Sequence, residues 1–219
     1  LLSECIPDYC DISYGTKVQS VKKDDKFIIK TKKEIYTANH LIIATGGLSI
    51  PSLGASDFGY SIAQQFGHTI IDTKPALVPL VIDNAEFPCA SIAGVSLPVE
   101  ISVLNSPMFR ESMLFTHKGL SGPAILQASS YITASSNLTI DLIPDIHDET
   151  FDNQSGKTEW RTVLSKHVPK RLADLWSEKN KQTQNIGHYS NKTIQAFINE
   201  LHHWSPKIKE TEGYAKAEV

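Results

Sequence analysis

The stretch "HLIIATGGLSIP" at residues 40–51 decides how this sequence is interpreted. Its apolar run, 41–44, is continuous rather than alternating, which is typical of a strand covered on both faces of a parallel sheet. The run stops on Thr45, Gly46 and Gly47, which predicts backbone N–H groups and a hydroxyl at the carboxyl edge of that sheet. Because glycines let the backbone approach a pyrophosphate or an adenine closely, the stretch predicts either a nucleotide contact or a simple tight turn.

The residues on either side of this stretch predict a β-meander before it and one helix after it. Apolar residues alternate between polar turns, which indicates strands at 11–14, 16–21, 27–31 and 34–37. Downstream, residues 57–67 predict a short helix with Ile62, Ala63 and Phe66 on one face and Gly67 just after its end.

The rest of the chain changes character twice. Short β-like segments interrupted by prolines favour an antiparallel sheet or small barrel, with segments at 77–82, 95–103, 113–115 and 138–142. Within this region, residues 122–131 predict a helix with Pro123 in its first turn. Helical patterns then follow at 159–167, 170–179 and 193–201, and the polar stretches 145–156 and 177–191 are interpreted as surface linkers.

Composition excludes several classes of protein. The 219 residues are 41% hydrophobic and carry a net charge of -3, so we expect neither nucleic acid nor a membrane as a partner, but a small-molecule substrate. The three cysteines (Cys5, Cys10 and Cys89) include no CxxC pair, and no two histidines have metal-ligand spacing with carboxylates. These features predict a cytoplasmic protein without a disulfide framework or a metal site.

Three longer blocks join the glycine stretch to the rest of the chain, namely "GGLSIPSLGASDFGYSIAQQFGHTI" (46–70), "KPALVPL" (74–80) and "LFTHKGLSGPAILQASSYI" (114–132). Together they resemble the bacterial YhiN-like family of FAD-binding proteins, which are NAD(P)/FAD-dependent or aminoacetone-oxidase-like oxidoreductases. The resemblance implies a mixed α/β and α+β fold in three parts. These are a partial FAD-binding domain at 1–70, an inserted β-barrel-like domain at 71–144 and 205–219, and a helical subdomain at 145–204.

The same resemblance implies FAD as the cofactor, contacted by Val18, Ala44, Thr45, Gly46 and Gly47. No GxGxxG fingerprint, which would seat the FAD pyrophosphate at a helix N-terminus, occurs in the sequence. Residues 1–5 lack an initiator Met and resemble the end of an amphipathic helix, and residues 215–219 stop without a helix-capping signal. We therefore expect a piece of a longer protein, which alone holds FAD weakly or not at all and is inactive.

A second group of polar residues follows the strand predicted at 113–115. Thr116, His117 and Ser121 are predicted to line the substrate side of a flavin site, with His117 transferring a proton near neutral pH. The alternative is that Ser121 caps the helix beginning at Gly122 and that His117 is only a turn residue.

Three functions are consistent with the sequence. The first is a flavin-dependent oxidoreductase acting on an unidentified small molecule, in which flavin performs the redox chemistry. The second is a noncatalytic binding or interaction module without cofactor. A third, nucleotide binding without redox chemistry, rests only on the glycine turn. The oligomeric state does not follow from the sequence.

Overall fold

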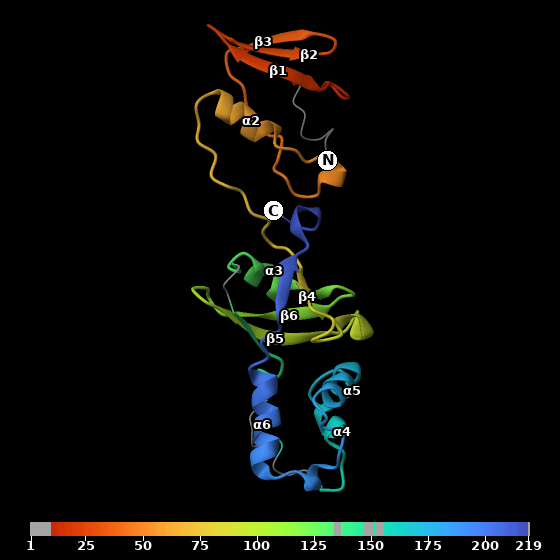
Figure 1. Ribbon diagram of the computed structural model, residues 1–219. Helices are drawn as coiled ribbons and strands as arrows, with labels where there is room; N and C mark the ends of the chain where they lie inside the picture. Colours follow the sequence, from red (N-terminus) through yellow and green to blue (C-terminus); the bar gives the residue numbers. More distant parts are fainter. Residues whose placement is uncertain (1–9, 134–136, 147–150, 152–155, 219) are drawn as a thin grey trace. The chain divides into compact units, whose positions relative to one another are not determined.

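The computed structural model describes residues 10–133, 137–146, 151 and 156–218 (Figure 1). The chain folds as two compact units, each described by itself below. Unit 1 comprises residues 1–46 and 56–71, and unit 2 comprises residues 47–55 and 72–219. The helix end predicted at residues 1–5 lies outside the described residues.

Unit 1 is a three-stranded antiparallel meander with one helix. The strands are β1 (Val18–Lys23), β2 (Phe27–Thr31) and β3 (Ile35–Ala38), and the helix is α2 (Phe58–Gln65). The helix is fixed to β1 because the Gln65 side-chain amide donates to the carbonyl of Val21 at 2.7 Å. The ring of Phe27 on β2 meets that of Phe66 at 6.0 Å, so a small apolar core forms between helix and sheet.

Two strand predictions in unit 1 are wrong. Residues 11–14 form no strand, and the run 41–44, predicted as a buried central strand, pairs with no described residue. Ile42 is 87% exposed. The apolar composition of 41–44 is typical of a strand buried within a sheet. Such burial requires neighbouring strands, and no described strand pairs with this run. The α2 prediction is confirmed, with Gly67 in the left-handed conformation (φ 85°) after the helix.

Unit 2 contains a six-stranded antiparallel sheet in the order β8-β5-β6-β7-β4-β9. The strands are β4 (Leu80–Ile82), β5 (Ser96–Val103), β6 (Phe109–Phe115), β7 (Gly119–Ser121), β8 (Leu138–Asp141) and β9 (Ile208–Thr211). An isolated bridge joins Ile140 of β8 to Trp204, just before the opposite edge strand, so the sheet curls into a partly closed barrel. Helix α3 (Pro123–Ser129) packs against β5 and β6 (Figure 1).

The sequence pattern explains why this sheet has one buried face. Along β5, buried and less buried residues alternate, as the period of two in a strand requires, with Leu97, Val99, Ile101 and Val103 facing the core. Strand β7 was not predicted, because three residues including a glycine give no periodic signal.

The helical part of unit 2 contains α4 (Trp160–Leu164), α5 (Lys170–Lys179) and α6 (Asn191–His202). Short 3-10 turns lie at Pro51–Leu53, Cys89–Ile92, Ile186–His188 and Gly213–Ala215. Helix α6 begins two residues earlier than predicted, because the Ser190 hydroxyl accepts the N–H of Thr193 at 3.1 Å and caps it.

The interpretation of 177–191 as a surface linker is only partly right, because residues 180–190 join α5 to α6 and are largely exposed, but the stretch also contains buried polar side chains. The side chains of Ser177 and Gln182 are fully buried, and the Gln182 amide donates to Glu200 at 3.1 Å. A polar composition was mistaken for exposure, although hydrogen-bonded polar side chains can be buried. Most of the other predicted linker, 145–156, lies outside the described residues, although Phe151 within it is buried.

The helices and the sheet share one hydrophobic core. Trp160, Leu172 and Trp176 belong to the same buried cluster as the strand residues. The guanidinium of Arg171 on α5 donates to the carbonyls of Ser91 and Ala93 beside the sheet. Whether the expected division at residues 145 and 205 separates independent domains stays a prediction, because the structure places the helices and the sheet in one unit.

His167, after α4, makes the stability of the helical part depend on pH. Its Nε2 is buried without a hydrogen-bond partner, and its ring meets that of Phe151 at 5.1 Å. Burial, followed by the charge of Lys166, lowers the pKa of His167 below its ordinary value of 6.5. The unfolded chain therefore binds the proton more readily, so stability is unaffected above this value and falls as the pH drops through it.

We therefore expect the urea midpoint of unit 2 to fall between pH 7.5 and 5.5, and to fall by less in His167→Gln. The exposed His188 provides the matched control, and His188→Gln should retain the full loss. An equal loss in all three proteins would contradict the role given to His167.

Candidate functional site

The predicted cofactor segment of unit 1 is exposed and contacts the first turn of a helix. Ala44, Thr45 and Gly46 are all exposed. A Cβ added to Gly59, in the first turn of α2, would lie 2.9 Å from the Thr45 hydroxyl oxygen, so this hydroxyl lies against that turn. The first N–H groups of a helix have no partners within it. Gly46 has φ 71° and no neighbour that its Cβ would meet within 4 Å, which leaves its backbone open to a ligand.

A groove of about 450 Å³ lies beside this segment, entirely within unit 1. Its lining is mainly apolar and comes from β1, β2, the exposed run and α2, with Phe27, Leu41, Ile43, Ile62 and Phe66 among the residues. An open glycine backbone, a hydroxyl beside a helix start and an apolar groove together fit a nucleotide that carries a flat ring system.

The other two predicted cofactor residues lie elsewhere. Val18 is half-buried at the start of β1, paired with Thr31, and is not among the residues lining the groove. Gly47 is the first residue of unit 2. The structure therefore groups Ala44, Thr45 and Gly46 and leaves the contribution of Val18 and Gly47 as a prediction.

The predicted catalytic residues lie on the hairpin formed by β6 and β7 in unit 2. The Thr116 hydroxyl accepts the N–H of Gly119 at 3.0 Å and therefore shapes the turn. His117 is exposed at this turn, and Lys118 pairs with Glu212 at 2.9 Å. Ser121 lies two residues further along, in the strand.

The capping role considered for Ser121 is wrong. The residue before the first turn of α3 is Gly122, with φ 90°, and no side chain caps this helix. Pro123 lacks an N–H, so the first turn has one donor fewer to satisfy. The Ser121 side chain is thus not committed to the helix, and its role with Thr116 and His117 stays a prediction.

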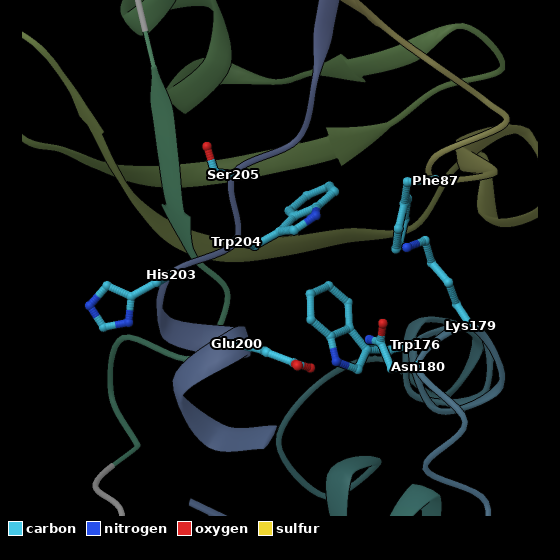
Figure 2. A pocket seen from close by; sticks show the side chains of 8 residues that line it. All are labelled: Phe87, Trp176, Lys179, Asn180, Glu200, His203, Trp204 and Ser205. Carbon is cyan, nitrogen blue, oxygen red and sulfur yellow. The ribbon is translucent and has the colours of Figure 1, made fainter. Parts of the chain in front are cut away.

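Sequence reasoning missed an aromatic pocket in unit 2, between the sheet and the C-terminal turns of α5 and α6 (Figure 2). Its volume is about 170 Å³. Hereafter "the aromatic pocket", it is lined by Phe87, Trp176, Lys179, Asn180, Glu200, His203, Trp204 and Ser205. In the sequence, Trp176 and Trp204 could have pointed to this pocket. They come together because Trp204 pairs with Ile140, and no local sequence pattern predicts a pairing between such distant segments.

Backbone and side-chain bonds fix one wall of this pocket. Ile140 and Trp204 exchange two backbone hydrogen bonds, at 2.8 and 3.0 Å. Next to them, Nδ1 of His202 lies 2.8 Å from a carboxylate oxygen of Asp141, and the N–H of Leu142 donates to the carbonyl of Leu201. The end of α6 is therefore clamped to β8, which holds the Trp204 ring in place.

Three further features of the described residues concern metal binding, the reactivity of Cys89 and membrane-spanning helices. Within the described ranges, no three His, Cys, Asp or Glu side chains gather closely enough to hold a metal ion. Burial raises the pKa of the Cys89 thiol to about 11, so at neutral pH this residue carries almost no thiolate, the reactive form of cysteine. Among the helices that the structure describes, none is long and apolar enough to cross a membrane.

Comparison with known proteins matches each unit to a different family model. Residues 74–219, which make up most of unit 2, match the model of the HI0933-like protein barrel and H2TH domain. Residues 8–67, which include most of unit 1 and residues 47–55 of unit 2, match the model of pyridine nucleotide-disulphide oxidoreductases. The fold thus defines a protein with an oxidoreductase-like β-meander unit and a curled barrel carrying helices.

The chain belongs to the HI0933-like family, and the resemblance to YhiN-like proteins found in the sequence is confirmed. It is 39% identical over its whole length to the ribosomal RNA dihydrouridine synthase of Escherichia coli, of which it covers 56%. It is 37% identical over 99% of its length to the protein of the same name in Haemophilus influenzae, of which it covers 58%.

A third relative has a different name. The 3-dehydro-bile acid delta(4,6)-reductase of Clostridium scindens is 27% identical over 94% of the chain, which covers 54% of that protein. The chain thus spans little more than half the length of the curated relatives it matches.

Proposed function

We propose that this chain is part of a flavin-dependent oxidoreductase that reduces a carbon–carbon double bond. One observation carries the proposal: the oxidoreductase model matches the unit that holds the exposed Thr45-Gly46 segment and the apolar groove beside it. In its reduced form, a bound flavin would supply the hydride for such a reaction, after an electron donor such as a nicotinamide dinucleotide has reduced it.

Three residues of unit 1 are assigned to the cofactor in this proposal. The nucleotide can come close to the backbone of Gly46, because glycine has no side chain and the space beside it is open. Ala44 and Thr45 continue the same exposed edge, with the hydroxyl as a hydrogen-bond donor. Val18 and Gly47 complete the predicted set on the resemblance alone.

The apolar surface of unit 1 supports an incomplete cofactor domain. Eight of the twelve large hydrophobic side chains exposed in the described structure belong to this unit, among them Tyr36, Ile42 and Ile43. An excess of exposed large apolar side chains is typical of a surface that another element covers. We propose that this surface packs against a segment such as the relatives carry outside the matched region, since the chain covers 58% and 56% of their lengths.

The names of the relatives agree on a class of bond. Uridine carries a double bond conjugated to a carbonyl, and its reduction gives dihydrouridine. A delta(4,6)-reductase likewise acts on conjugated double bonds. Reduction of such a bond delivers a hydride to one carbon and a proton to the other. We propose that His117, exposed at its turn, supplies the proton, with Thr116 and Ser121 orienting the substrate.

A local concentration of charge favours RNA over a steroid as the substrate. Residues 17–33 contain two aspartates and seven lysines, all of them exposed: Lys17, Lys22, Lys23, Lys26, Lys30, Lys32 and Lys33. Such a surface attracts phosphates. The absence of a nucleic acid partner was expected from the net charge of -3, which is a sum over the whole chain and does not show the local positive charge of this meander. That expectation stays untested.

An absorbance spectrum tests the cofactor. We replace the matched region of the E. coli relative, which is 56% of its length, with these 219 residues, and call the product the chimera. The purified chimera should show flavin bands after desalting, whereas the 219-residue chain should retain little FAD. A chimera that is folded by circular dichroism but colourless, even after incubation with FAD, would favour the noncatalytic module instead.

A further inference from the structure

We propose that the aromatic pocket binds a single pyrimidine base, with a preference for uracil. This inference rests on the proposed function for its source of ligand, because uridine in RNA is the substrate class favoured above. It concerns a binding site in unit 2 that is separate from the predicted cofactor residues of unit 1.

The volume of the pocket selects the size of the ligand. At about 170 Å³, it is close to the roughly 150 Å³ of an engineered protein cavity that holds one benzene molecule. One six-membered ring therefore fits. A three-ring flavin and a four-ring steroid are both too large for it, so the pocket is not the site of the cofactor or of a bile acid.

The walls of the pocket select a flat ring. The ring centroids of Phe87 and Trp204 lie 4.8 Å apart, and that of Trp176 lies 5.9 Å from each of them. Phe87 and Trp176 are buried, whereas Trp204 remains partly exposed and offers a surface for stacking. Base stacking on such a side chain is a common means of holding an unpaired base.

The polar groups select a neutral base over an anion. The lining residues include those of the C-terminal turns of α5 and α6, where carbonyl groups give a partial negative charge. The carboxylate of Glu200 adds to it, and in Figure 2 it points toward the indole of Trp176, while the imidazole of His203 points away. A phosphate or carboxylate would be repelled here, so Lys179 does not make this an anion site.

The pattern of donors and acceptors matches uracil. One oxygen of Glu200 accepts from Gln182, and the other has no partner among the described residues, so it can accept the ring N–H of uracil. The Asn180 amide lines the same pocket and can donate to a carbonyl that flanks the ring N–H. The Trp176 indole N–H has no partner but is buried, so it can donate to the second carbonyl only if the indole ring shifts. Cytosine has a lone pair in place of that N–H and would face the carboxylate unfavourably.

Binding is measured with the 219-residue chain and fluorescein-labelled single-stranded oligouridylate or oligocytidylate, by anisotropy, with free uridine and cytidine as competitors. We expect oligouridylate to bind more tightly than oligocytidylate, and uridine to compete better than cytidine. Trp204→Ala should weaken binding of oligouridylate about tenfold. If free uridine competes as strongly as a base within the oligomer, the ligand is a nucleoside. Equal binding of both oligomers would overturn the proposal.

A second variant keeps the test valid if Trp204→Ala does not fold. Glu200→Gln places an amide that can donate to the cytosine ring nitrogen, so the preference for uridine should disappear or reverse. Glu178→Gln, an exposed glutamate on α5 outside the pocket, is the matched control and should keep the preference. An unchanged preference in Glu200→Gln would overturn the pocket assignment. Because no flavin is needed, failure here is distinguishable from failure of the chimera to bind FAD.

Discussion

Gly119→Ala is expected to destabilise unit 2 by at least about 3 kcal/mol, the upper range for overpacking a core. Gly119 pairs with Val81 where β7 meets β4. A Cβ there would lie 2.3 Å from the Leu80 carbonyl oxygen and 2.6 Å from the Ile82 nitrogen, and both atoms are backbone. This clash can be relieved only if β4 and β7 move apart. Their separation would loosen the packing of Leu80 and Leu120, which are fully buried.

Urea unfolding followed by circular dichroism measures this loss. The matched control is Gly156→Ala, where the added carbon would meet its nearest neighbour at 3.5 Å, an ordinary contact. We expect this control to change the free energy of unfolding by less than about 1 kcal/mol. Equal stability of the two variants would show that β4 and β7 do not pair as described.

Gly46→Val is expected to lower the affinity of the chimera for FAD by at least about tenfold. Gly46 has φ 71°, a conformation that a β-branched residue rarely adopts. The valine side chain would also fill the open space that the proposal assigns to the nucleotide, and losing a close backbone approach weakens binding by more than strain alone.

The affinity is measured by titrating the flavin-free chimera with FAD. Gly54→Val separates strain from a binding role, because Gly54 also has a positive φ (97°) and no neighbour within 4 Å, but is not assigned to the cofactor. Both variants should lose some stability, and only Gly46→Val should lose FAD. If the two retain FAD equally, Gly46 merely shapes a turn.

Local patterns predicted much of the fold. The alternation along β5 and the helical spacing of α5 are carried by neighbouring residues, so both elements lie close to the expected positions. The failures arise where structure depends on distant partners. The run 41–44 has the composition of a buried strand but no partner among the described residues, and Gln182 is polar yet buried against Glu200.

The two candidate sites also differ in whether neighbouring residues or distant residues form them. The sequence could single out Thr45 and Gly46 because glycine and a short hydroxyl side chain mark the segment within a few residues, and their contact with a cofactor stays a prediction. The aromatic pocket could not, because Phe87, Trp176 and Trp204 are far apart in the sequence. Their convergence follows from the pairing of Trp204 with Ile140 and from a core shared by helices and sheet.

The most direct test of the account measures dihydrouridine in ribosomal RNA. E. coli cells that lack the relative are supplied with the chimera, and their ribosomal RNA is digested to nucleosides and analysed by mass spectrometry. If the chain belongs to a flavin-dependent reductase of uridine in RNA, the chimera should restore dihydrouridine, and Gly46→Val should restore less. A folded, flavin-bound chimera that forms no dihydrouridine would contradict the account.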